Sequence, residues 1–278
     1  MDSRNIILSP EMKKDTTIIF IFFLIAYPLL VASAHFTQSY VIFQSRGVST
    51  NPPKHLDVTE MVLITSDGER LNAWWQQAKN AKRTILYFQA NGTNISHKIS
   101  RMNTFFKMGV NALLIDYRGY GKSTGRIKKE RDIYTDALTA WDFLTVQKKI
   151  APEEIIIWGR SLGGGVAAEI AQFKDIAALV LESTFYSLDE IASRQYWFLP
   201  TKWLLRFHFA NGDKLKNISA PTVIIHSVED KYIPFSQATR LFDSAAGPKL
   251  ILKTSGSHLD PFDSQSTALS KLMVYLSL

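Results

Sequence analysis

The 278-residue sequence contains no cysteine. That absence excludes a disulfide-stapled fold, a zinc site built on thiolates and a cysteine nucleophile. Hydrophobic residues make up 46% of the chain and charged residues 21%, which is typical of a folded protein and excludes a disordered one. The net charge of +7 fits an acidic partner, an anionic membrane surface or solubility alone. Since no nucleic-acid recognition motif accompanies this charge, we expect no nucleic-acid partner.

A second absence marks the N-terminal part of the chain. No Asp, Glu, Lys or Arg occurs from Thr16 to Ser45, and the stretch from Ile18 to Ala34 is almost wholly apolar. A membrane-spanning helix needs about 20 such residues. A helix of a soluble domain normally keeps a polar face, which this stretch lacks. We therefore predict a membrane-directed segment within residues 1–35.

Two roles remain open for this segment. It is a cleaved signal peptide if Pro28 ends the apolar helix and Ala32-Ser33-Ala34 is the cleavage site. It is an uncleaved signal anchor if the long preceding segment, in which acidic residues dilute the basic ones, is retained, and we favour this anchor. In both cases Lys13 and Lys14 stay in the cytoplasm. The catalytic part is then expected on the periplasmic or extracellular side, either anchored or secreted after cleavage.

Strand and helix signals alternate in the rest of the chain. Short apolar runs such as Ile155–Ile157 are typical of strands buried on both faces of a parallel sheet, and Asp67-Gly68 predicts a hairpin. The pattern predicts one α/β domain with a mostly parallel, eight-stranded sheet and helices on both faces. The predicted units are the anchor or signal peptide (1–35), a linker (36–56) and the α/β domain (57–278). Predicted strands cover 58–65, 71–77, 84–89, 112–117, 154–159, 178–182, 222–227 and 249–253, and predicted helices cover 96–108, 132–147, 162–173, 236–245 and 264–277.

The segment 184–219 is too long for a single connecting helix and is rich in aromatic residues. Such an insertion at the strand ends of an α/β sheet is a candidate lid or substrate wall. It is equally compatible with a helical excursion whose aromatic side chains pack onto the domain. Its aromatic residues are Phe185, Tyr186, Tyr196, Trp197, Phe198, Trp203, Phe207 and Phe209.

The sharpest local motif is Gly159-Arg160-Ser161-Leu162-Gly163, a G-x-S-x-G sequence. The motif alone is weak, but it follows a strand-like run and opens a helix-like Gly- and Ala-rich run. Strand, sharp turn and helix are the context that a nucleophile elbow requires, and its glycines avoid collisions around a strained serine. Ser161 is therefore the candidate nucleophile.

A serine nucleophile needs a base, and the base needs an orienting acid. Downstream of Ser161, His258 lies in a flexible turn between the last strand and the last helix, where the base is expected. His226 falls inside an apolar strand and is expected to be a packed core residue, and His208 lies in the aromatic insertion.

The acid is expected after the preceding strand, where Glu229 and Asp230 are adjacent. Asp230 is preferred because its spacing from the strand and from the following Ile-Pro puts it in the loop. Glu229 is the fallback, and Glu182, at the end of an earlier strand, is a more distant alternative.

Several of these motifs occur together in a fixed order. They are Asp116–Ser123 (DYRGYGKS), Gly159–Gly165, Glu182–Phe185, Phe198–Pro200 and the segments around Asp230 and His258. In this order they resemble the bud-emergence-related and ABHD-type serine hydrolases of the α/β-hydrolase superfamily. That group includes monoacylglycerol lipases and protein depalmitoylases, and many members carry an N-terminal membrane anchor. The resemblance, over roughly residues 40–275, implies the α/β-hydrolase fold and a Ser161–His258–Asp230 triad.

The resemblance also implies the position of an oxyanion hole. The family typically has His-Gly-Asn after the third strand, and this sequence departs from it with Gln89-Ala90-Asn91. Because the donor is a main-chain N–H, its chemistry survives a change of side chain. Asn91 matches the family's donor position, and its expected partner is the N–H of Leu162.

The sequence as a whole predicts a membrane-anchored serine hydrolase of carboxylic esters, acting through an acyl-enzyme on lipid-like or other small ester substrates. No metal or organic cofactor is implied. A peptidase or acyltransferase on the same triad, and an inactive hydrolase fold used for binding, remain alternatives. A basic stretch from Lys122 to Arg131 is either a solvated loop or a contact with anionic lipid headgroups. The sequence does not determine the oligomeric state.

Overall fold

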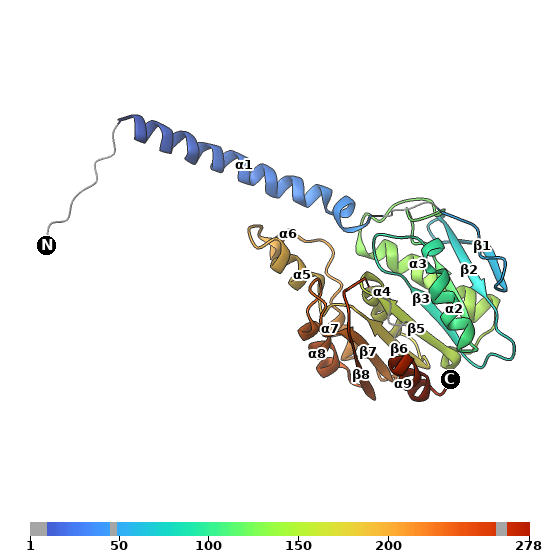
Figure 1. Cartoon of the computed structure of the whole chain (residues 1–278). Helices are drawn as coiled ribbons and strands as arrows, with labels where there is room; N and C mark the ends of the chain where they lie inside the picture. The colour runs from blue at the N-terminus through green and yellow to red at the C-terminus, as the bar shows by residue number, and fades with distance from the viewer. Residues whose placement is uncertain (1–9, 45–48, 260–265) are drawn as a thin grey trace.

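A computed structural model describes residues 10–44, 49–259 and 266–278. Its longest element is helix α1 (Pro10–Ile42), whose N-terminal part projects away from the domain and whose C-terminal end lies against it (Figure 1). The part of α1 from Phe20 to Ile42 is long and apolar enough to cross a membrane, by length and composition.

Helix α1 bears on two expectations: a helix end at Pro28, which belonged to the signal-peptide alternative, and the linker expected from residue 36. It continues through Pro28, although proline lacks the N–H that would complete one helical hydrogen bond. It also runs through the start of the expected linker to Ile42. The side chains of Gln38 and Ser39 are buried against the domain, and this burial stabilises the added turns. The remainder of the expected linker has no helix or strand among its described residues.

One eight-stranded sheet forms the centre of the domain, in the order β1-β2-β4-β3-β5-β6-β7-β8. Strand β2 runs antiparallel to both of its neighbours, and every other adjacent pair is parallel. The predicted mostly parallel sheet is confirmed. The strands are β1 (Val58–Ile64), β2 (Arg70–Gln76), β3 (Thr84–Phe88), β4 (Asn111–Ile115), β5 (Ile155–Arg160), β6 (Ala178–Glu182), β7 (Thr222–Ser227) and β8 (Lys249–Thr254).

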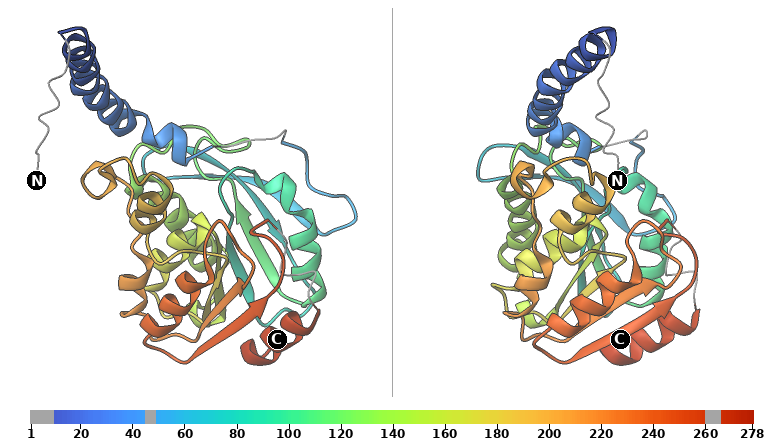
Figure 2. Two further views of the ribbon diagram at one scale, coloured as in Figure 1. Left: turned by 60° about the vertical axis from the view of Figure 1, so that its left-hand side comes forward. Right: turned by 90° about the vertical axis from the view of Figure 1, so that its left-hand side faces the viewer.

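Helices cover both faces of this sheet (Figure 2). On one face α3, α4, α7 and α8 pack onto every second strand residue, and on the other face α2 and α9 do so. This alternation is the reason that the central strands read as unbroken apolar runs. The helices are α2 (Ile99–Lys107), α3 (Glu130–Asp142), α4 (Leu162–Ala171), α5 (Leu188–Gln195), α6 (Thr201–Leu204), α7 (Asn211–Leu215), α8 (Phe235–Ser244) and α9 (Ser266–Leu276). Residues 264 and 265 of the last predicted helix lie outside the described part of the chain.

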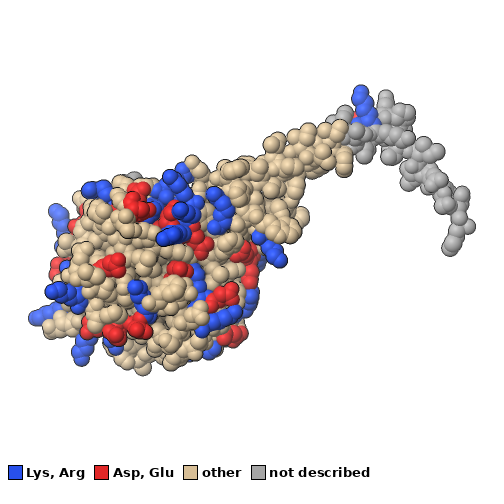
Figure 3. Space-filling model, turned by 180° about the vertical axis from the view of Figure 1, so that it is seen from behind, with Lys and Arg blue, Asp and Glu red and all other residues tan. Residues whose placement is uncertain are grey.

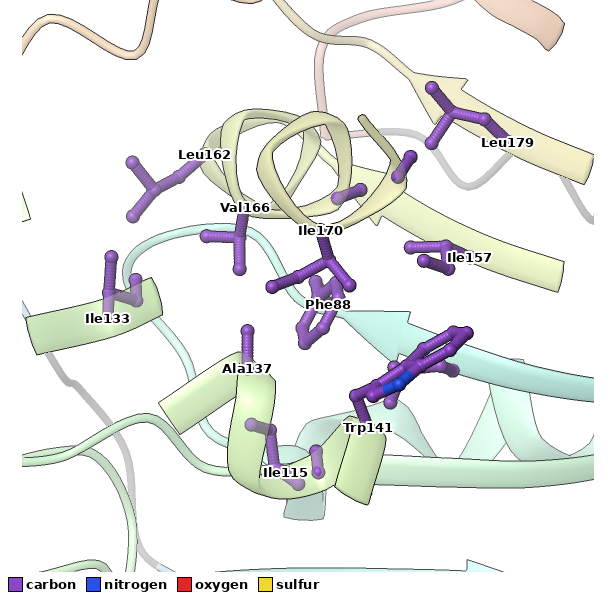
Figure 4. Close-up of a cluster of buried hydrophobic side chains, with 14 of the residues drawn as sticks. Phe88, Ile115, Ile133, Ala137, Trp141, Ile157, Leu162, Val166, Ile170 and Leu179 are labelled. Atoms are coloured by element: carbon purple, nitrogen blue, oxygen red, sulfur yellow. The ribbon is translucent and has the colours of Figure 1, made fainter. Parts of the chain in front are cut away.

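Helix α4 is held at the centre of the domain by this packing. Leu162, Val166 and Ile170 point from α4 toward α3 and toward Phe88 and Ile157 of the sheet (Figure 4). All five side chains are buried. The turn that precedes α4 therefore has a rigid support.

The aromatic insertion contains α5, α6 and α7 and divides into two parts. Phe185, Phe207 and Phe209 are buried in the domain core. This part of the insertion packs onto the domain, as expected for a helical excursion. Trp197 and Trp203 are 81% and 83% exposed. Trp203 belongs to α6, which contacts α1, and Trp197 lies in the segment just before α6.

Candidate active site

Ser161 occupies the turn between β5 and α4 with φ +50° and ψ −116°, a backbone conformation that few non-glycine residues adopt. Its main-chain N–H donates to the carbonyl of Glu182 (2.9 Å), and its carbonyl accepts from the Thr184 hydroxyl (2.7 Å). A Cβ at Gly163 would lie 2.1 Å from the carbonyl oxygen of Phe88. The close approach of strand and helix explains why glycine is needed there.

His258 lies directly beside this serine. Its Nε2 is 3.1 Å from the Ser161 hydroxyl oxygen, and its Nδ1 is 2.7 Å from Oδ2 of Asp230. The three residues come from the ends of β5, β7 and β8, which the parallel sheet brings to one edge. The structure thus brings together the three predicted side chains.

Asp230 is held by several donors at once. Its Oδ1 accepts the main-chain N–H groups of Tyr232 (2.9 Å) and Ile233 (2.8 Å), while Oδ2 accepts from His258. Burial alone would raise the pKa of this carboxyl, but the hydrogen bonds from His258 and Ile233 outweigh it, so the pKa is lowered. Asp230 is therefore ionised at neutral pH.

His226 is a packed core residue, as predicted, but it also lies next to the acid. Its Nε2 is 2.8 Å from the carbonyl oxygen of Ile233 and 3.5 Å from Oδ2 of Asp230. A carbonyl only accepts, so Nε2 carries the proton. Burial lowers the pKa of His226, which keeps the ring neutral. Its proximity to Asp230 follows from the turn after β7, and no sequence pattern identified it.

The loop after β3 approaches Ser161 from the other side. The N–H groups of Leu162 and Asn91 donate to no other residue in the described part of the chain. The Asn91 side chain connects this loop to the end of α1: its Nδ2 donates to the Ile42 carbonyl, and its Oδ1 accepts from the Gln44 N–H (3.1 Å). Its Oδ1 also accepts from the Tyr120 hydroxyl (2.5 Å).

A buried carboxyl fixes the base of the same loop. Asp116 accepts from the Ile95 N–H (2.8 Å), the Gln89 amide (3.3 Å) and the Asn72 amide (3.1 Å). Burial raises the pKa of Asp116. Gln89, which replaces the family's histidine, is thus a buried support of the loop, and the motif that contains Asp116 was the sequence signal for this contact.

Ser161 opens into a cavity of about 1690 Å³. One side of the cavity is apolar and is formed by α1, α5 and α6, with Leu30, Ala34, Val41, Ile191, Leu199 and Leu204 among its lining residues. Helix α1 is fixed there by hydrogen bonds between Gln38 and the insertion, to the Leu204 carbonyl (3.1 Å) and from the Arg206 N–H (2.8 Å). Helix α1 is therefore one wall of the cavity.

The other side of the cavity is basic. It is lined by Lys98, Arg101 and Arg160, none of which was a predicted site residue. Glu182 forms an ion pair with Arg101 (2.7 Å) and lies 3.5 Å from Nε of Arg160. Glu182, the most distant candidate for the acid, thus holds two guanidinium groups and does not contact His258 in the described structure.

The other candidate residues lie apart from the reacting atoms. Glu229 accepts the Gly256 N–H (2.7 Å), which fixes the turn that carries His258. His208 pairs with Asp189 (2.9 Å) on the surface of the insertion. Within residues 10–44, 49–259 and 266–278, no group of three or more His, Asp and Glu side chains is arranged to hold a metal ion.

Comparisons with known proteins show which sequences this chain resembles. Residues 96–250 match the model of the prolyl oligopeptidase family. Human alpha/beta hydrolase domain-containing protein 17B is 30% identical over 220 residues, which cover 77% of this chain and 73% of that protein. The WAV2 protein of Arabidopsis thaliana, also named as alpha/beta hydrolase domain-containing, is 32% identical over 71% of each chain. An uncharacterized protein of Mycobacterium tuberculosis is 33% identical over 73% of each chain.

Solved structures show the same fold. A Pyrococcus furiosus esterase superposes with a TM-score of 0.71 over 85% of this chain and 97% of that one, at 18% identity. An acetyl xylan esterase from Paenibacillus superposes with a TM-score of 0.65 over 82% and 86%, also at 18% identity. At this identity the likeness concerns the fold alone.

Proposed function

Because the chain belongs to the prolyl oligopeptidase family of α/β-hydrolases, we propose that it is a membrane-anchored serine hydrolase of acyl esters. The observation that carries the proposal is the continuous chain of contacts from Asp230 through His258 to Ser161. No metal or organic cofactor enters the proposed reaction.

The protonation states follow from the contacts. Since Asp230 is ionised and only accepts, the proton between it and His258 belongs to Nδ1 of His258. Nε2 is then free to accept the proton of the Ser161 hydroxyl. This is the tautomer that a general base needs in order to activate a serine.

The proposed reaction has two halves. Ser161 Oγ attacks the ester carbonyl while His258 takes its proton, and the N–H groups of Leu162 and Asn91 stabilise the oxyanion. The C–O bond of the ester breaks, His258 protonates the departing alcohol, and the acyl group stays on Ser161. Water, activated by the same histidine, then releases the acid.

The surroundings of the cavity favour a lipid-like substrate. From Thr16 to Ile42 helix α1 has no Asp, Glu, Lys or Arg, and the part of it next to the domain carries no charged side chain (Figure 3). The half of α1 nearest the domain lines the apolar part of the cavity. The exposed Trp197 and Trp203 belong to the insertion, and the carbonyl of Phe198 accepts from the Tyr27 hydroxyl of α1 (2.9 Å). Tryptophan beside a membrane helix is typical of the membrane–water interface. An acyl chain can thus pass from a bilayer along α1 to Ser161, with the domain on the non-cytoplasmic side.

A chain-length panel tests this proposal with the full-length protein in detergent. The wild type is expected to cleave palmitoyl esters faster than butyryl esters, and Ser161→Ala should cleave neither. Ala34→Trp fills the apolar wall and should reduce the rate on palmitoyl esters while sparing that on butyryl esters. Leu24→Trp lies on an exposed part of α1 outside the cavity and is the matched control. Hydrolysis confined to short polar esters would overturn the lipid assignment.

Assays with other substrates distinguish ester hydrolysis from the two alternative activities of the same triad. Assays with a peptide substrate, or with an ester and an added alcohol acceptor, distinguish a peptidase or an acyltransferase from an ester hydrolase. An inactive fold used for binding would hydrolyse none of these substrates and would not react at Ser161.

A further inference from the structure

The cavity has a basic region whose charge the proposed ester hydrolysis does not use. Lys98, Arg101 and Arg160 place three cations along one side of the cavity. Glu182 contacts both arginines and is shared between them. Asp116 lies near Lys98, but its oxygens are bonded to Gln89, Asn72 and Ile95 beneath the loop.

Lys98 is the cation that has no carboxylate of its own. In the described structure its ammonium donates to the Thr93 hydroxyl (2.7 Å) and forms no ion pair with an acidic side chain. Thr93 lies two positions after Asn91 on the same loop, and Asn91, Lys98 and Ser161 all line the one cavity. Burial, together with the nearby Arg160 and Arg101, lowers the pKa of Lys98 to about 8.

This arrangement disfavours the charged form of Lys98. A partly desolvated ammonium beside two guanidinium groups is stabilised when an anion enters. A phosphate group suits the position, because it carries nearly two negative charges at neutral pH and accepts several hydrogen bonds from lysine and arginine. The apolar wall formed by α1, α5 and α6 is left for the acyl chain.

We propose that the alcohol part of the substrate carries a phosphate, and that Lys98, with Arg101 and Arg160, binds it beside Ser161. This inference rests on the proposed ester hydrolysis and names its substrate class, an acyl ester of a phosphorylated alcohol such as a monoacyl glycerophosphate. The ester C–O bond breaks, the phosphorylated alcohol leaves with the proton from His258, and the acyl group remains on Ser161 until water releases it. The phosphate itself is not transferred.

A matched pair of substrates tests the inference: 1-oleoylglycerol and 1-oleoylglycerol 3-phosphate, which differ in the phosphate alone. With the full-length protein in neutral detergent micelles, kcat/KM is expected to favour the phosphate ester by about tenfold or more. Lys98→Met should reduce this ratio by about tenfold, and Lys98→Arg should retain most of it. Lys216→Met, which removes an exposed lysine paired with Asp213, should change neither the ratio nor the rates.

Three outcomes separate this inference from the proposed function. If the wild type cleaves both esters equally, or if Lys98→Met keeps the ratio, the phosphate subsite is wrong while ester hydrolysis stands. If inorganic phosphate strongly inhibits cleavage of the neutral ester and the phosphate ester has no advantage, the site takes a free anion and the inference is overturned. If neither ester is cleaved and a fluorophosphonate probe does not label the folded protein, the proposed function fails, and the inference fails with it. Probe labelling of Lys98→Met shows that its active site is still folded.

Discussion

Nδ1 of His258 lies 2.7 Å from Oδ2 of Asp230, although the two residues are 28 positions apart in the chain. Asp230→Asn would keep the shape of this contact but would donate where the carboxylate accepts, which favours the wrong tautomer of His258. We expect kcat for ester hydrolysis to fall about 10⁴-fold. The adjacent Glu229→Gln is the matched variant, because Glu229 binds the Gly256 N–H and does not contact His258. The kcat of Glu229→Gln should fall by no more than about tenfold. If steady-state assays gave equal losses of kcat for the two variants, Asp230 would not be the acid of the triad.

The turn at Ser161 gives a prediction about stability. Gly163→Ala places a methyl group 2.1 Å from the Phe88 carbonyl oxygen, and both groups are held by the core. We expect a loss of about 3 kcal/mol in the free energy of unfolding. Gly109→Ala is the control: its φ of +71° is strained, but nothing lies within 4 Å of the added methyl, so the loss should be about 1 kcal/mol. Thermal unfolding in detergent measures both, and similar midpoints for the two variants would show that the close approach is not required.

The pH dependence of the phosphate preference follows from Lys98. Burial, then Arg160 and Arg101, lower the pKa of Lys98 to about 8, against the opposing effects of Glu182 and Asp116. A lysine is charged below its pKa and neutral above it. The preference for the phosphate ester should therefore be full about one unit below pH 8 and largely lost about one unit above it.

The control for this pH profile is Lys98→Arg, since arginine stays charged throughout the range and should keep the preference. The phosphate of the substrate, with a second pKa of about 6, does not titrate there. The ratio of kcat/KM for the two oleoyl esters is the quantity to follow, because it cancels effects on the triad that both esters share. A ratio that is constant across the same range in the wild type would contradict the role of Lys98.

The sheet could be predicted because burial on both faces leaves a direct trace in the sequence. Runs such as Ile155–Ile157 are apolar at every position, since helices cover both sides of β5. The three triad candidates could be placed for the same reason. Each follows a recognisable strand, and parallel strands bring their ends to one edge.

Contacts between distant segments could not be predicted in this way. Gln38 falls within the predicted linker 36–56, yet its amide donates to the Leu204 carbonyl, 166 positions away. The role of Lys98 and Arg101 was missed because lysine and arginine at helical spacing are also typical of a solvated surface. Only the folded chain, in which β3, β5 and β6 are neighbours in the sheet, brings Arg101 to Glu182 and places Lys98 in the lining of the same cavity as Ser161.

The most direct test of the account is covalent labelling of the full-length protein with a fluorophosphonate probe, followed by identification of the labelled residue. The account predicts an adduct on Ser161 that disappears in Ser161→Ala and in His258→Ala, and that persists in Ser277→Ala, which changes an exposed serine near the C-terminus. A folded wild-type protein that does not react, or a label that persists in Ser161→Ala, would contradict it.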